Sequence, residues 1–292
     1  YEPSPKDIQA IGKSDLFVYT GGDSDEWVDG ILSSIDKSKL KTLKMMDTVK
    51  LYEEEMSEGM QEEEHEHHHD DKDHHDEDKD HHHDEDKEHH HDDKDRHDKE
   101  HHHDDKEHHH HDGEEGPEMD EHVWTSPANA IQIVKALTET ISGLDKDNAQ
   151  TYQKNAEAYI AKLEKLDKDF HDVIDHAKRK EIIVGDRFPF LYFAKEFGLT
   201  YYAAFPGCST DTEANPATIA FLVDKVKEDH IPVVFHIEMS NEQMSKAIAE
   251  ATGAKNELLN AVHNVSDEEF KKGVTYIDLM NHNVKVLKEA LN

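Results

Sequence analysis

The chain has 292 residues and a formal net charge of −35, from 68 acidic and 33 basic side chains. Such a negative molecule repels phosphate backbones, which argues against nucleic-acid binding. The sequence has no run of about 18 apolar residues that could span a bilayer. Its single cysteine, Cys208, excludes an internal disulfide framework and any cysteine-rich zinc fold.

The first part of the chain predicts alternating helices and strands. Residues 4–11 have the capping residues and apolar spacing of a short helix. The apolar run 16–19 is stopped by two glycines and predicts a buried strand. The apolar residues of 27–32 predict a second helix, and a second strand is expected within 41–49. The pattern is typical of a βα lobe.

Residues 62–112 form a low-complexity insert in that lobe. They contain 20 of the 27 histidines, with 24 acidic and 7 basic side chains and no apolar residue. Burial therefore cannot stabilise a fold there, and we predict a disordered loop. Neutral imidazoles suit zinc, nickel and copper, so the loop is predicted to bind divalent metal ions at auxiliary sites. The candidate ligands are His67, His68, His69, His81, His82, His83, His101, His102, His103, His108, His109 and His110.

The segment 120–127, with the sequence DEHVWTSP, follows this insert and leads into an apolar helix. Ser126 is placed as the N-cap of that helix and Pro127 as its first residue. These residues fix the backbone beside His122, which makes His122 a candidate metal ligand. The alternative is an ordinary surface histidine.

Residues 145–178 predict one long helix. Apolar residues from Tyr152 to Val173 recur at alternating spacings of four and three, which places a single apolar seam along the helix. A coiled coil is one interpretation. A helix that links two lobes fits better, because βα patterns lie on both sides.

Residues 179–292 predict a second βα lobe with a parallel sheet covered on both faces. The predicted strands are 181–185, 200–204, 232–237 and 257–261, and the predicted helices are 188–197, 215–229, 240–252 and 276–291.

In parallel sheets, binding sites form beyond the carboxyl ends of the strands. Five candidates follow strand ends here: Asp186, Cys208, Glu213, Glu238 and His263. Taken singly, each has an ordinary alternative as a helix cap, a surface acid or a buried thiol. The chain has no Gly-x-Ser-x-Gly, phosphate loop or His-Glu-x-x-His motif, so we do not expect an enzyme.

These features together resemble the zinc/manganese solute-binding proteins of ABC importers. Residues 1–8 and 16–21 are similar to the first lobe of that family, and 120–127 is similar to its Asp-x-His-x-Trp-x-(Ser/Asp)-Pro motif. A charged, histidine-rich loop before that motif marks the zinc members. The resemblance covers essentially the whole chain.

The resemblance implies an α/β fold of two βα lobes, with mainly parallel sheets and a metal cleft between the lobes. A long rigid helix would join them. The expected division is an N-terminal lobe at 1–144, a linking helix at 145–178 and a C-terminal lobe at 179–292.

The resemblance also implies a site with three histidines and often an acid. Only the motif histidine maps cleanly, onto His122. The first histidine would precede Tyr1, and the opening strand and helix of the family are missing, so we expect a chain truncated at its N-terminus. The second-lobe histidine would occupy the position of Gly185. We therefore expect His263 as its replacement, with Cys208, Glu238 and Asp186 as further candidates.

The expected function is an extracytoplasmic receptor that captures Zn²⁺ and delivers it to an ABC permease, with Mn²⁺ or Ni²⁺ as other ions. We expect a monomer, periplasmic or held at the membrane only by an upstream lipid anchor. The alternative is a zinc or nickel storage protein or metallochaperone that acts through the histidine-rich loop. A surface adhesin would need an exposed apolar or basic patch, which the sequence does not locate.

Overall fold

The structure is a computed structural model that describes residues 3–60, 117–209 and 215–292. The predicted loop at 62–112, with its twelve candidate histidines, lies outside the described residues, as does Glu213. The described residues on both sides of that loop belong to one compact unit.

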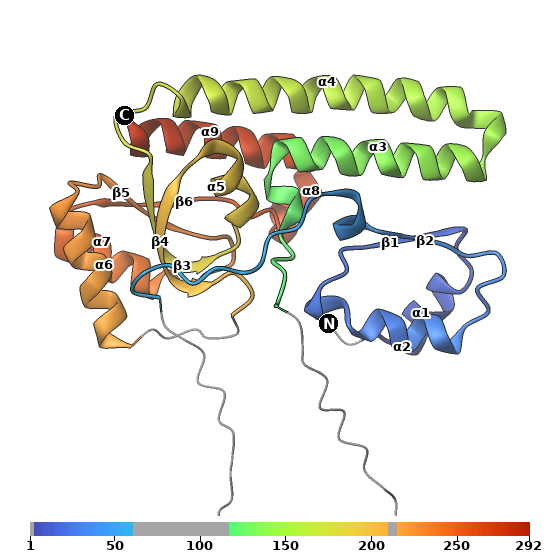
Figure 1. The fold of residues 1–292 in the computed structure, drawn as a ribbon, viewed down its shortest axis with the longest axis horizontal. Helices are drawn as coiled ribbons and strands as arrows, with labels where there is room; N and C mark the ends of the chain where they lie inside the picture. Colours follow the sequence, from blue (N-terminus) through green and yellow to red (C-terminus); the bar gives the residue numbers. More distant parts are fainter. Residues whose placement is uncertain (1–2, 61–116, 210–214) are drawn as a thin grey trace, which may run out of the picture. The chain divides into compact units, whose positions relative to one another are not determined.

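The N-terminal part contains a small βαβ arrangement (Figure 1). Helix α1 (Pro5–Ile11) begins at Ser4, whose side chain forms a capping box with Asp7. Strand β1 (Leu16–Tyr19), helix α2 (Trp27–Ser34) and strand β2 (Lys41–Lys44) follow. β1 and β2 pair in parallel, so the predicted helices and strands of this region are confirmed. β1 is not buried as predicted, because it lies in a sheet of only two strands and Val18 is exposed.

Two antiparallel helices follow the predicted motif and lie side by side in Figure 1. Helix α3 (Pro127–Leu144) has Ser126 as its N-cap, with the Ser126 hydroxyl accepting a hydrogen bond from Asn129 N at 3.0 Å. Helix α4 (Ala149–Ile174) has 26 residues and is shorter than the predicted helix at 145–178. The Asp145 carboxylate caps a 3₁₀ turn that precedes α4, and this turn keeps the regular helix from extending back to Asp145.

The C-terminal part is built on a parallel sheet with strand order β4-β3-β5-β6. Its strands are β3 (Glu181–Phe188), β4 (Thr200–Pro206), β5 (Val233–His236) and β6 (Lys255–Leu258). Its helices are α5 (Leu191–Phe197), α6 (Pro216–Glu228), α7 (Gln243–Thr252), α8 (Asp267–Lys272) and α9 (Tyr276–Leu291). The predicted βα lobe with a parallel sheet is confirmed.

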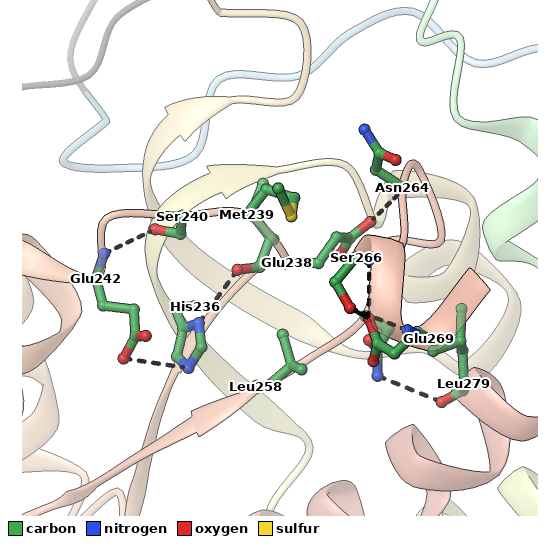
Figure 2. A pocket seen from close by; sticks show the side chains of 12 residues that line it. His236, Glu238, Met239, Ser240, Glu242, Leu258, Asn264, Ser266, Glu269 and Leu279 are labelled. Atoms are coloured by element: carbon green, nitrogen blue, oxygen red, sulfur yellow. Dashed lines mark hydrogen bonds and ion pairs between the residues drawn. The ribbon is translucent and has the colours of Figure 1, made fainter. Parts of the chain in front are cut away.

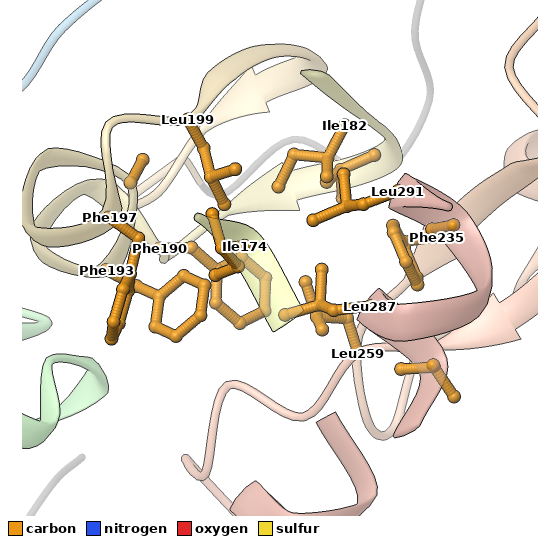
Figure 3. Packing of buried hydrophobic residues seen from close by; sticks show 14 of the residues in the cluster. Ile174, Ile182, Phe190, Phe193, Phe197, Leu199, Phe235, Leu259, Leu287 and Leu291 are labelled. Atoms are coloured by element: carbon orange, nitrogen blue, oxygen red, sulfur yellow. The ribbon is translucent and has the colours of Figure 1, made fainter. Parts of the chain in front are cut away.

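Helices cover both faces of this sheet because successive strand residues point to opposite sides. Ile182 and Val184 pack with α4, α5 and α9, whereas Ile183 packs with α6 and α7. Figure 3 shows the first of these clusters, where side chains such as Phe193 and Leu287 meet the sheet. This core fixes the sheet edge beyond which Cys208, Glu238 and His263 lie.

Two strands differ from the prediction in ways that affect the site. β3 does not end at Gly185 but continues to Phe188 through a shift in its register with β4 between Val184 and Arg187. β6 ends at Leu258, whereas the predicted strand was 257–261. The chain therefore leaves the sheet earlier and reaches His263 by a loop. No helix among the described residues is both long and apolar enough to cross a membrane.

Candidate metal centre

One cavity of about 340 Å³ brings together side chains from distant parts of the chain. It contains His122, Cys208 and His263, which are three of the predicted ligands. The residues that line it are Thr20, Ser24, Asp25, Glu121, His122, Trp124, Arg187, Gly207, Cys208, Ser209 and His263.

His122 is buried, with 4% of its surface exposed, and its ring is fixed from behind. The Asp120 carboxylate lies 3.1 Å from His122 Nδ1 and also accepts a hydrogen bond from His122 N at 2.8 Å. The Tyr192 hydroxyl in turn donates to the carbonyl of Asp120 at 2.7 Å. A carboxylate at Nδ1 favours the tautomer protonated there, which leaves the Nε2 lone pair for a metal ion.

His263 lies against His122, with the ring centroids 4.7 Å apart and the planes at 75°. Trp124 contacts both rings, and its Nε1 donates to the carbonyl of Ala261 at 2.9 Å. This bond ties the motif to the loop that carries His263. Desolvation of the ring, reinforced by the positive charge of Arg187, lowers the pKa of His263 to about 4, although the residue as a whole is exposed. Its ring is therefore neutral at pH 7, as a metal ligand requires.

Gly207 allows the loop after β4 to approach the imidazole of His122. A Cβ atom at this position would lie 2.9 Å from the carbonyl oxygen of Phe188 and 3.1 Å from His122 Cε1. A side chain there would displace the Phe188 carbonyl and press on the His122 ring. The sequence offered only one signal for this role, a Pro-Gly pair at a strand end.

Cys208 lines the cavity but is poorly prepared to bind a metal ion. Burial, together with the negative charges of Glu54, Asp120 and Glu121, raises the pKa of the thiol well above its usual range. Since the thiolate is the form that binds metals, the bound ion would have to displace a firmly held proton. Cys208 therefore stays a prediction, with less support than His263.

The Glu238 carboxylate faces backbone groups rather than the cavity beside His122. It accepts hydrogen bonds from the amides of Ala261 at 2.7 Å, His263 at 2.6 Å and Asn264 at 3.4 Å. Figure 2 shows it in a separate cavity of about 210 Å³, which His236 also lines. Because β6 ends early, the loop folds back over Glu238. The structure thus places Glu238 as a support for the His263 loop and not beside the ring of His122.

Asp186 does not line the cavity that contains His122. It lies inside β3 at the register shift, where its carboxylate accepts hydrogen bonds from the Ser240 hydroxyl and, at 2.9 Å, from Arg187 N. It lines another cavity of about 180 Å³. The sequence placed it after the strand, and the longer strand is the reason for the difference.

Three charged residues of the cavity were not among the predicted ligands: Asp25, Glu121 and Arg187. Glu121 is buried, and its Oε1 accepts a hydrogen bond from Ser24 N at 2.6 Å. Gly22 allows this approach, since a Cβ there would lie 2.2 Å from Glu121 Cγ. The acid beside His122 and the two glycines after β1 were the available signals. For Arg187 there was none.

The described residues contain no group of three or more His, Cys, Asp or Glu side chains arranged to hold a metal ion. What they do provide is a pair of imidazoles facing one cavity. Zinc is usually four-coordinate and accepts nitrogen, sulfur and oxygen ligands. His122 and His263 are therefore the candidates for two of its positions.

Known proteins match the whole chain. The family model described as "ZnuA: Zinc-uptake complex component A periplasmic" matches residues 1–290. The zinc-binding lipoprotein AdcA of Streptococcus pneumoniae R6 is 30% identical over 99% of this chain and 48% of its own length. The high-affinity zinc uptake system protein ZnuA of Bacillus subtilis is 33% identical over 100% of this chain and 76% of its own. The chain thus spans about half the length of the first of these relatives.

Solved structures give the same result. The Zn(II)-bound ZnuA-like domain of S. pneumoniae AdcA has a TM-score of 0.68 and 27% identity, covering 100% of this chain and 85% of that one. The metal-dependent lipoprotein YcdH of B. subtilis has a TM-score of 0.69 and 30% identity, with the same coverage. These likenesses confirm the predicted α/β class with two lobes.

Proposed function

Because the chain belongs to the ZnuA family of zinc-uptake components, as its motifs predicted, we propose that it is an extracytoplasmic zinc receptor. It captures Zn²⁺ and delivers it to the permease of an ABC importer, either in the periplasm or held at the membrane by a lipid anchor. The relatives named as zinc-binding lipoproteins and as a zinc uptake protein support this role. The role makes and breaks no covalent bond, so we propose no enzymatic activity.

The observation that carries the proposal is the contact between His122 and His263, whose ring centroids are 4.7 Å apart in one cavity. The two residues lie 141 positions apart in the sequence (263 minus 122). Imidazole is a preferred ligand of zinc, whereas manganese prefers carboxylate, carbonyl and water oxygens. A pair of imidazoles therefore favours Zn²⁺ as the captured ion over Mn²⁺.

The surrounding residues prepare the two rings before the metal arrives. Asp120 orients the ring of His122, and Glu238 holds the loop of His263 through backbone amides. Trp124 packs against both rings and fills the space beside them. Ligands that are fixed in advance lose little freedom on binding, which favours a tight site.

The histidine-rich loop at 62–112 lies outside the described residues, and we propose an auxiliary role for it. Many weak sites on one chain raise the local concentration of the ion. The storage alternative instead makes this loop the main zinc-binding element. The two functions differ in what remains when the loop is removed.

The test measures zinc affinity by competition with a chelator of known affinity. The samples are the full chain, a variant without residues 62–112, and that variant with His122→Ala. We expect one tight site to survive loop deletion. His122→Ala should weaken zinc binding at this site by about 10-fold or more, because even the loss of a residue that only hydrogen-bonds to a metal ligand lowers affinity by that factor. A storage protein would lose its tight binding with the loop. Equal affinity with and without His122 would contradict the assigned ligand.

A further inference from the structure

Arg187 places a positive charge in the cavity that we propose to receive a metal cation. Its Nη1 donates to the carbonyl of Ser209 at the long distance of 3.4 Å, and its Nε lies 3.9 Å from the Asp186 carboxylate. It has no closer polar partner among the described residues. The side chain is 37% exposed, so its donors are accessible from the cavity that it lines. The positive charge of Arg187 repels a metal cation, so Arg187 does not by itself favour binding of the bare ion.

The cavity is also larger and richer in donors than a bare ion needs. Its volume is about 340 Å³, whereas one water molecule takes up about 30 Å³ of liquid. Thr20 and Ser24, which carry hydroxyl groups, line it together with Arg187. Hydroxyl and guanidinium groups donate hydrogen bonds, and a guanidinium fits a carboxylate in a two-pronged geometry.

The carboxylates of the cavity are already engaged with the backbone. Glu121 Oε1 accepts from Ser24 N at 2.6 Å, and Asp25 Oδ2 accepts from Gly21 N at 2.9 Å. The described residues hold no ready group of three metal-binding side chains. Two imidazoles leave a four-coordinate zinc ion with positions to fill.

We propose that zinc is captured together with a small carboxylate-type oxyanion that binds Arg187. One oxygen of the anion coordinates the metal, and the others accept hydrogen bonds from the guanidinium. The anion completes the coordination of zinc and neutralises Arg187 in a single step. The inference rests on the proposed function, since it requires zinc at His122 and His263. Bicarbonate from solution and the carboxylate of a small metal chelate share this chemistry.

The experiment follows zinc binding in the cavity by the fluorescence of Trp124, which contacts both imidazoles. The chain has two tryptophans, so Trp27→Phe in the full chain makes Trp124 the only indole. Its fluorescence then follows the cavity and not the histidine-rich loop. Free zinc is fixed with a chelator buffer, and midpoints are compared without added anion and with bicarbonate, acetate or citrate.

We expect bicarbonate or another carboxylate to lower the free zinc concentration at the midpoint by about 10-fold, and Arg187→Gln to abolish this shift. Arg187→Lys keeps the charge but loses the planar fork, so it should retain only part of the shift. Arg179→Gln is the matched control, because its guanidinium donates to Ala290 O and does not line the cavity. A response to bicarbonate alone, or to citrate alone, identifies the source of the anion.

Several results would overturn the proposal. If Arg187 only repels the metal, Arg187→Gln tightens zinc binding with and without anion. If a carboxylate of the chain itself meets Arg187, the variant weakens binding equally in both conditions. A zinc response that no anion changes overturns this inference and leaves the proposed function standing. A Trp124 signal that zinc never changes contradicts both.

Discussion

Asp120 shows that a candidate metal ligand depends on the residues that hold it in place. Its Oδ1 contacts both the ring and the backbone nitrogen of His122, and only 1% of its surface is exposed. A buried carboxylate in this place does more than cap a turn. It favours the tautomer of His122 that carries its proton on Nδ1 and leaves the Nε2 lone pair for a metal ion.

We predict that Asp120→Asn weakens the tight zinc site by about 10- to 100-fold, the usual range for such supporting groups. The amide keeps the size and one acceptor oxygen but lacks the negative charge. The measurement is the Trp124 fluorescence titration with zinc, alongside far-ultraviolet circular dichroism to show that the fold is kept. A folded variant with unchanged affinity would show that Asp120 does not act through His122.

Individual residues also mark the limit of what the sequence could predict. His122 could be found because its motif includes the helix cap that positions it. Arg187 and Gly207 could not, because their roles arise from contacts with residues far away in the chain. Asp186 and Glu238 follow predicted strand ends, yet a register shift and an early strand end direct their carboxylates elsewhere.

At the scale of elements, the packing of α7 against β3 accounts for Gly185, the position at which the resemblance implied the second-lobe histidine. A Cβ atom at Gly185 would lie 2.6 Å from the Cα atom of Ser245 in α7. A histidine at this position would require α7 to move. His263 approaches the cavity from another strand end, which is consistent with its proposed role as the second imidazole.

We predict that Gly185→Ala lowers the free energy of unfolding by about 1–3 kcal/mol, the usual cost of overfilling a packed interior. The control is Gly143→Ala in α3, where no atom lies within 4 Å of the added Cβ. That change should be neutral or stabilising by about 0.5–1 kcal/mol, since alanine favours helix. Urea unfolding of the three proteins measures both values. A Gly185→Ala variant as stable as its parent would show that α7 can shift at little cost.

Helix and strand periodicity predicted most of the elements, and local capping explains where it failed. The helices 276–291 and 216–228 lie where their apolar spacing and caps placed them. The long helix begins at Ala149 and not at the predicted residue 145, because the Asp145 carboxylate accepts a hydrogen bond from the Asn148 amide in a 3₁₀ turn. Side-chain bonds of this kind compete with the helix and have only a weak sequence signal.

Glu196 in α5 links three helices and gives the fold a pH dependence. Its Oε1 accepts a hydrogen bond from Ala128 N in the first turn of α3, at 3.1 Å. Burial, opposed by hydrogen bonds from Ser126 and Ala128 and reinforced by Asp167 in α4, raises the pKa of Glu196 from 4.5 to about 7. The folded protein therefore binds more protons than the unfolded chain between these two values.

This difference in bound protons decides how the stability of the protein changes with pH. The contribution of Glu196 to stability is fully present below about pH 4.5 and is lost as the pH rises towards 7. We predict that the stability of the parent relative to Glu196→Gln falls over this range, as measured by thermal unfolding at pH 5, 6 and 7.5. Glu139→Gln on the exposed side of α3 is the control. A Glu196→Gln difference that does not change with pH would contradict the raised pKa.

At the scale of the whole molecule, the chain divides into a packed unit and a segment of extreme composition. Residues 62–112 carry a net charge of −17 out of −35, so the remainder has a charge of −18. The described chain on either side of the segment is paired. Glu54 N donates to the carbonyl of Glu118 at 2.9 Å, and Asp120 N donates to the carbonyl of Tyr52 at 3.0 Å.

This pairing makes deletion of 62–112 a clean test of the molecule's organisation. An isolated antiparallel bridge between Glu53 and Met119 already holds the two ends together, so a short glycine–serine linker can join them. Loop-closure entropy changes only slowly with loop length. We predict a thermal midpoint within a few degrees of the parent, because the insert has no apolar residue to bury. Equilibrium dialysis should show several weak zinc equivalents lost and one tight equivalent kept. A loss of cooperative unfolding on deletion would mean that the segment stabilises the packed unit, and the division into two functional parts would then be wrong.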